Sequence, residues 1–170
     1  MNAEARQHLD FVCQAMVDVA KRHVLKGGCD PVVVMLVKKK DGERGLFHVE
    51  GAPQILKHTN HLSVLRAIIA DLWDDIREEN DGEELDAVLM VVESVLVPIL
   101  PGEPIPKMDK KKFDAAKMLM LLLCTEEGTA AFGYKVYNTT AGPMFMDDER
   151  EELDSRFAEL SDLYPHKDQK

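Results

Sequence analysis

The chain has 170 residues, 45% of them hydrophobic, and a formal net charge of −10. This length fits one domain, and the hydrophobic content lies well above the range of disordered chains. The negative charge argues against direct binding to nucleic acid or to an anionic membrane, because both kinds of partner require a basic face. We therefore expect one folded domain over residues 1–165 and a frayed tail over residues 166–170.

Three features favour a cytoplasmic protein. The longest apolar runs, Ala87–Val92 and Met118–Cys124, are far shorter than the ~20 residues that a membrane span requires. Charged residues interrupt the N-terminus where a signal peptide would be apolar. The cysteines are widely spaced, odd in number and set in or beside apolar stretches, so we expect buried, reduced thiols at Cys13, Cys29 and Cys124.

The first fifty residues predict a helix and a β-hairpin. Apolar residues recur at three- and four-residue spacing over Leu9–Val24, and Gly27–Gly28 ends this amphipathic pattern. The β-branched run Val32–Val37 and the extended segment Arg44–Glu50 then flank a turn at Asp41–Gly42.

A second helix is predicted to end in an acidic cluster. Thr59 or Asn60 is a suitable N-cap, and a core stripe runs from Leu62 to Ile76. The last turns carry carboxylates, which oppose the helix dipole at that end. This placement makes the acidic side chains a candidate surface for a basic partner: Asp71, Asp74, Asp75, Glu78 and Glu79.

The stretch Leu85–Val97 predicts the central strand of a sheet. Its only polar residues after Asp86 are Glu93 and Ser94, and a strand that is apolar on both faces is typical of a sheet covered on both sides. A carboxylate in such a strand must be paired or have a raised pKa. Glu93 is therefore either a structural ion-pair partner or a general base, with His48 as its candidate neighbour.

A proline-rich stretch, Pro98–Pro106, follows the central strand. Its Pro-x-x-Pro spacing is typical of ligands for aromatic-lined grooves, although prolines in a connection also stiffen it. We expect Pro101 and Pro104 to lie on an exposed contact surface.

Residues 113–124 fit either a helix or a strand. The strand interpretation makes a simple hairpin, in which Lys117–Cys124 and Ala131–Asn138 flank a Glu-Glu-Gly turn, and we choose it. The predicted order of elements is then α-β-β-α-β-β-β-α. Adjacent hairpins indicate a mainly antiparallel sheet of about five strands, covered by helices, in an α+β fold.

A last helix is predicted after a cap at Asp147 or Asp148. Its narrow apolar stripe consists of Leu153, Phe157, Leu160 and Tyr164. Phe157 and Leu160 are candidate contacts of a dimer through this helix, and a dimer through an exposed sheet edge is the alternative.

The sequence lacks the standard signatures of nucleotide-binding, hydrolase and metalloprotease sites. His58 and His61 are weak candidates for a metal site, because no Asp, Glu or Cys accompanies them at ligand spacing. Two histidines at a helix entry are more often surface residues. No cofactor is expected.

Because no catalytic constellation is gathered, we expect a non-enzymatic protein that binds another protein and self-associates as a homodimer. Two alternatives remain open. One is an acidic, nucleic-acid-mimicking inhibitor of a basic partner protein. The other is a small acid–base enzyme that uses Glu93 and His48.

Overall fold

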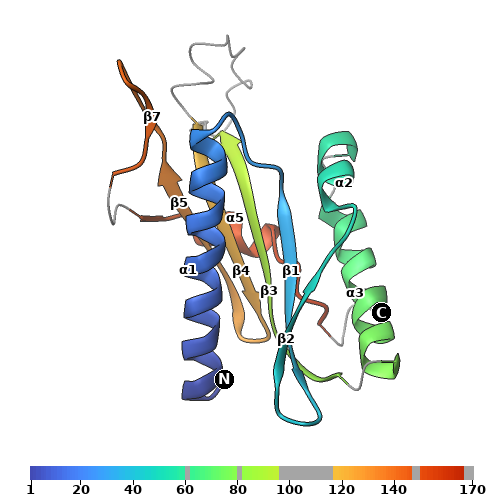
Figure 1. The fold of residues 1–170 in the computed structure, drawn as a ribbon. Coiled ribbons are helices and arrows are strands. Elements are labelled where there is room, and N and C mark those ends of the chain that lie inside the picture. Colours follow the sequence, from blue (N-terminus) through green and yellow to red (C-terminus); the bar gives the residue numbers. More distant parts are fainter. Residues whose placement is uncertain (60–61, 80–81, 96–116, 147–149, 167–170) are drawn as a thin grey trace.

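The computed structural model describes residues 1–59, 62–79, 82–95, 117–146 and 150–166. These residues form an α+β fold around a six-stranded sheet, in which all neighbouring strands are antiparallel (Figure 1). The strands, in their order across the sheet, are β2 (Arg44–His48), β1 (Val32–Lys39), β3 (Gly82–Val95), β4 (Lys117–Thr125), β5 (Gly128–Lys135) and β8 (Glu151–Glu152).

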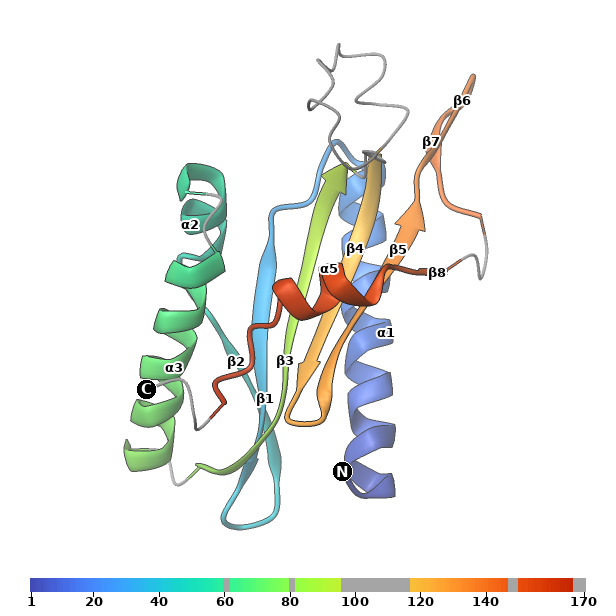
Figure 2. The same ribbon diagram turned by 180° about the vertical axis from the view of Figure 1, so that it is seen from behind.

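Helices cover both faces of this sheet. The long helix α1 (Ala3–Leu25) packs on one face, and its apolar stripe contributes to two clusters of buried residues there. The opposite face carries α2 (Ala52–Thr59), α3 (Leu62–Glu79) and α5 (Ser155–Leu160), which share a larger cluster (Figure 2). A small hairpin of β6 (Tyr137–Thr139) and β7 (Gly142–Met144) extends from the end of β5.

The central strand is confirmed. In β3, Val88 and Met90 belong to the cluster under α3, whereas Leu89 and Val91 belong to the clusters under α1. All four side chains are buried. Alternating apolar residues on both faces therefore place β3 in the interior of the sheet, between β1 and β4.

Two irregularities interrupt the pairing of β1 with β3. Leu36 is opposite Ala87 and Val37 is opposite Leu85, so Asp86 is an extra residue on β3. A second shift follows closely, between Lys38 and Lys39. Bulges of this kind increase the local twist and redirect the side chains beside them.

Both hairpins that the sequence predicts are present. The β1–β2 hairpin has the expected bounds to within a few residues, and β4 pairs with β5 across a turn at Glu126–Glu127. The strand interpretation of Lys117–Cys124 is thus confirmed. The second strand was placed too late in the chain, because β5 begins at Gly128 and ends at Lys135.

One helix was missed. The segment Gly51–Pro53 breaks the strand as expected but also starts α2, because proline is tolerated in the first turn of a helix. Ala52 is fully buried, and Ile55 and Leu56 pack against the core. Thr59 is therefore the last residue of α2, and Asn60, the other predicted cap, lies outside the described residues.

The predicted last helix is present as α5, but it is shorter than expected, and the prediction that Leu153 and Tyr164 lie on its apolar stripe was wrong. Glu151–Glu152 pairs with β5 as an edge strand, and Leu153 N–H donates to the carbonyl of Ala131 at 2.8 Å. The helix begins only after Asp154, whose Oδ1 accepts from the N–H of Arg156 at 2.8 Å. Asp147 and Asp148 lie outside the described residues. With only Ser155–Leu160 helical, a coiled-coil seam is too short to form.

Candidate functional site

The neighbourhood of Glu93 is the first candidate site. The carboxylate lies near the end of β3, beside the loop that follows α1. That loop turns sharply through Gly27 and Gly28, whose positive φ angles of 125° and 149° suit glycine. An open depression of about 590 Å³ adjoins it, lined by His23, Lys26, Gly27, Gly28, Cys29, Asp30 and Glu93.

Glu93 has two partners at this site. Its Oε1 forms an ion pair with the Nζ of Lys117 on the neighbouring strand β4. Its Oε2 accepts a hydrogen bond of 3.0 Å from the backbone N–H of Cys29. The side chain is 16% exposed. A cation and a backbone donor thus hold the carboxylate, in agreement with the structural interpretation of a buried charge that is paired.

The structure does not bring His48 to Glu93. His48 is opposite Val34, and Val34 is opposite Leu89, four residues before Glu93 on β3. With ~4.8 Å between strands and ~3.3 Å per residue along a strand, the two Cα positions are roughly 16 Å apart. His48 is also exposed. This separation is too large for the direct or water-bridged proton transfer that an acid–base pair requires.

The thiols are not activated as nucleophiles. Burial raises the pKa of Cys13 to about 11 and that of Cys124 to about 12. Burial also raises the pKa of Cys29, and Asp30 next to it adds to this shift. A nucleophilic cysteine needs a lowered pKa, because the thiolate is the reactive form.

The metal hypothesis gains no support. The side chain of His58 and the whole of His61 lie outside the described residues. Among the residues that the structure does describe, no three His, Cys, Asp or Glu side chains are grouped closely enough to hold a metal ion. Within the same part of the chain, no helix has the length and apolarity that crossing a bilayer requires.

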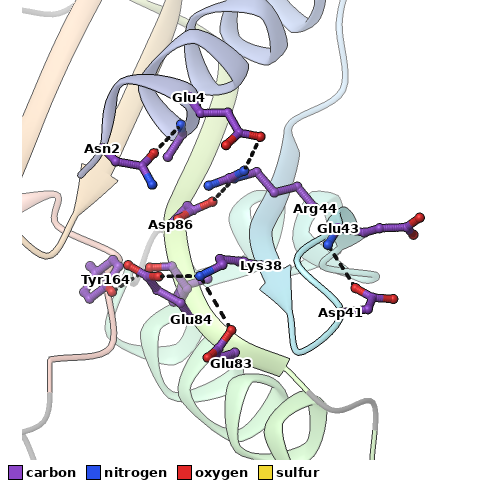
Figure 3. A network of polar contacts seen from close by, with 12 residues as sticks. Asn2, Glu4, Lys38, Asp41, Glu43, Arg44, Glu83, Glu84, Asp86 and Tyr164 are labelled. Atoms are coloured by element: carbon purple, nitrogen blue, oxygen red, sulfur yellow. Dashed lines mark hydrogen bonds and ion pairs between the residues drawn. The ribbon is translucent and has the colours of Figure 1, made fainter.

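The acidic end of α3 is the second candidate site. We call its four exposed carboxylates, those of Asp71, Asp75, Glu78 and Glu79, the α3 acidic face. Asp74 is half-buried, and its Oδ1 pairs with Arg77 Nη2 at 2.8 Å. The acidic character continues into the start of β3, where Glu83 and Glu84 lie 3.5 and 3.8 Å from Lys38 Nζ (Figure 3).

The remaining predicted contact residues have different surroundings. Pro101 and Pro104 lie outside the described residues. Phe157 is half-buried against the core of the α3 face of the sheet. Leu160, in contrast, is 76% exposed at the end of α5. Of these residues, Leu160 is therefore the one that the structure places in solvent.

Two polar arrangements were missed by sequence reasoning. One is an ion pair between Arg44 and Asp86, with 2.8 Å between Nε and Oδ2. The Oε1 atom of Glu4 lies 3.5 Å from Arg44 Nη1 and forms a second ion pair with this guanidinium (Figure 3). The only signal in the sequence was the position of Asp86, a carboxylate directly before the apolar run Ala87–Val92.

The second arrangement is centred on Asp162, after α5. Its Oδ1 accepts from the hydroxyl of Thr129 at 2.8 Å and from the N–H of Tyr164 at 3.0 Å. Its Oδ2 is 2.7 Å from Nε2 of His166. Burial opposes ionisation, but these hydrogen bonds together outweigh it and hold the pKa of Asp162 below its usual value.

Comparison with protein-family models, with curated protein sequences and with solved structures gave no match.

Proposed function

We propose that this protein acts by binding a basic macromolecular partner through the α3 acidic face, and not by catalysis. The observation that carries the proposal is the exposure of Asp71, Asp75, Glu78 and Glu79 on one helix. Exposed charges of one sign steer and select a partner of the opposite charge.

The position of these charges on the helix supports a role in binding. Glu78 and Glu79 occupy the last turn of α3, where the helix dipole disfavours negative charge. Arg77 is the basic residue of that turn and is paired with Asp74. Glu78 and Glu79 therefore do not stabilise α3, and a contact with another molecule accounts for them better.

The candidate catalytic groups support the same conclusion. Glu93 is held by Lys117 and the Cys29 N–H, and His48 lies two strands away. The thiol pKa values are raised, which disfavours nucleophilic catalysis. A nucleic-acid-mimicking inhibitor is the more specific form of the proposal, since its basic partner would normally bind phosphates.

Two matched variants test this proposal. The first replaces the four residues of the α3 acidic face with Gln; the second makes the same change at Glu126, Glu151, Glu152 and Glu159, which are also exposed. Each variant carries the same net charge. Binding to a lysine-rich peptide is measured by calorimetry over a range of salt concentrations.

We expect the first variant to bind at least about tenfold more weakly, a loss of ~1.4 kcal/mol, and the second to bind nearly as well as the natural chain. The first variant should also unfold at a slightly higher temperature, because charges that oppose the dipole are removed. Equal losses in both variants would mean that only net charge matters and would contradict the proposal. The narrower inhibitor hypothesis predicts that the natural chain and the second variant displace duplex DNA from the peptide, and that the first variant does so much less.

A further inference from the structure

The outer edge of β2 is an unpaired strand edge. In the β1–β2 hairpin, Lys39 N–H donates to the Glu43 carbonyl and Val49 N–H donates to the Val33 carbonyl. Backbone groups alternate in direction along an antiparallel strand. The N–H and C=O groups of Arg44, Leu46 and His48 therefore point away from β1, and within the described part of the chain no strand pairs with them.

We propose that two copies of this chain associate through their β2 strands into one continuous antiparallel sheet. The inference does not depend on the proposed function, since it concerns a different surface. A two-fold axis beside Leu46 would place Leu46 opposite Leu46 of the second copy and Arg44 opposite His48 of the second copy. In this register the outward N–H groups of each strand meet outward carbonyls of the other.

An exposed apolar side chain lies on the edge itself. Leu46 is 47% exposed on the face of the sheet that α1 covers elsewhere, opposite the fully buried Leu36. Pairing about the two-fold axis would bring the two Leu46 side chains together, and directly opposite residues are ~5 Å apart in such pairs. Self-pairing thus removes apolar area from water at its centre.

Apolar residues also flank the edge on the opposite face. Phe47 is half-buried there, on the same side of the sheet as α3. Arg66 on α3 donates hydrogen bonds to the backbone carbonyls of Leu160 and Asp162, at and just after the end of α5. Because α5 lies over β5, this flank of α3 faces the β5 side of the sheet. The other flank of α3 faces away from α5, toward β2, and carries apolar residues at four-residue spacing: Val64, Ile68 and Leu72.

β2 lacks two devices that often prevent such pairing, namely a proline and a bulge. Natural edge strands carry prolines, bulges or free charges. β2 has no proline, and its pairing with β1 is regular throughout. The charge of Arg44 does not protect the edge, because its side chain is 7% exposed and paired with Asp86. A second copy is the favoured occupant because the pairing about Leu46 is self-complementary.

The test compares two variants by size-exclusion chromatography with light scattering. The natural chain should show a mass that rises with concentration from 19.1 kDa toward twice that value. Leu46→Lys should keep the lower mass at concentrations where the natural chain is dimeric, because it sets two like charges opposite each other. Phe11→Lys is the control: Phe11 is 72% exposed on α1, away from β2, and its replacement should leave the mass unchanged.

Hydrogen exchange of the natural chain gives a second, mutation-free readout. The amide of Val49 is bonded to β1 and should be protected at every concentration. The amides of Leu46 and His48 should become protected only as the dimer forms. A mass of 19.1 kDa at all concentrations would overturn the proposal. The alternative would then be that a strand of a different protein pairs with this edge. A dimer that persists in Leu46→Lys, without protection of these amides, would place the contact elsewhere and overturn it too.

Discussion

The side chains of Arg44 and Asp86 form a buried ion pair, with 2.8 Å between Nε and Oδ2 (Figure 3). They are 7% and 3% exposed, and they come from strands β2 and β3, which are not adjacent. The bulge at Asp86 lets the carboxylate reach Arg44 across β1. Glu4 from the first turn of α1 approaches the same guanidinium, so the pair links the sheet to the start of the helix.

We predict that Asp86→Leu lowers the free energy of unfolding by about 3 kcal/mol, because the buried Arg44 charge then keeps only the exposed Glu4, at 3.5 Å, as a described partner. The double variant Arg44→Met/Asp86→Leu should lose much less, since both charges are replaced by apolar groups. Urea unfolding of Asp86→Leu, Arg44→Met and the double variant completes the cycle. A double variant as unstable as the sum of the single ones would show that the two charges do not interact.

A second prediction concerns acid. The folded-state pKa of Asp162 is lowered, so its ionised form stabilises the fold. This contribution is fully present above the pKa of an unfolded Asp, which is about 3.9, and is lost as the pH falls through the lower folded-state value. Asp162→Asn should therefore cost about 1–3 kcal/mol near neutral pH and progressively less in acid.

The measurement is the free energy of unfolding of both proteins as a function of pH. Asp10→Asn is a suitable control, because Asp10 is exposed on α1 and far from the Asp162 contacts. If the difference between Asp162→Asn and the natural chain stayed constant down to the lowest pH, the hydrogen bonds to the carboxylate would not be stabilising its charged form.

A third prediction addresses Glu93. Lys117→Met removes the cation and leaves the carboxylate with the Cys29 N–H as its remaining described partner. Since Glu93 is only 16% exposed, we expect a loss of about 1–3 kcal/mol in the free energy of unfolding. Glu93→Gln/Lys117→Met should recover much of it, because Gln can still accept from Cys29 without carrying a charge. Equal stability of the Lys117→Met variant and the natural chain would show that the pair is only a surface contact.

The architecture was largely predictable because its strands carry strong local signals. Leu85–Val97 is apolar on both faces, and each long hairpin has a polar turn between two apolar runs. The missed helix α2 begins at Ala52, next to Pro53. We interpreted this proline as the end of a strand, but proline is also common in the first turn of a helix. The last helix was misplaced because Leu153, which is buried, and Tyr164, which is half-buried, lie on non-helical segments on either side of α5.

The polar contacts were much less predictable. Arg44 and Asp86 are 42 residues apart in the sequence. Their side chains meet because of a bulge in β3, and no pattern in the sequence predicts that bulge. Glu93 was correctly singled out as a carboxylate needing a partner, but the identity of that partner follows from the register of β3 with β4. The registers of β2 with β1 and of β1 with β3 likewise place His48 far from Glu93, although both residues lie on strands of one sheet.

The last prediction concerns the order in which the thiols react. At pH 8 a thiol with a pKa of about 11 is ionised to a fraction of ~10⁻³, and one with a pKa of about 12 to ~10⁻⁴. Cys124 is in addition fully buried, with Leu163 N–H donating to its Sγ at 3.3 Å. Cys29 is half-buried and lines the open depression, where a reagent can approach it, although burial and Asp30 raise its pKa as well. In a titration with an aromatic disulfide reagent we therefore expect Cys29 to react first and Cys124 only at the rate of unfolding. Cys29→Ser should abolish the fast phase, and a fast phase that survives this change would mean that the region around Cys13 or Cys124 opens readily.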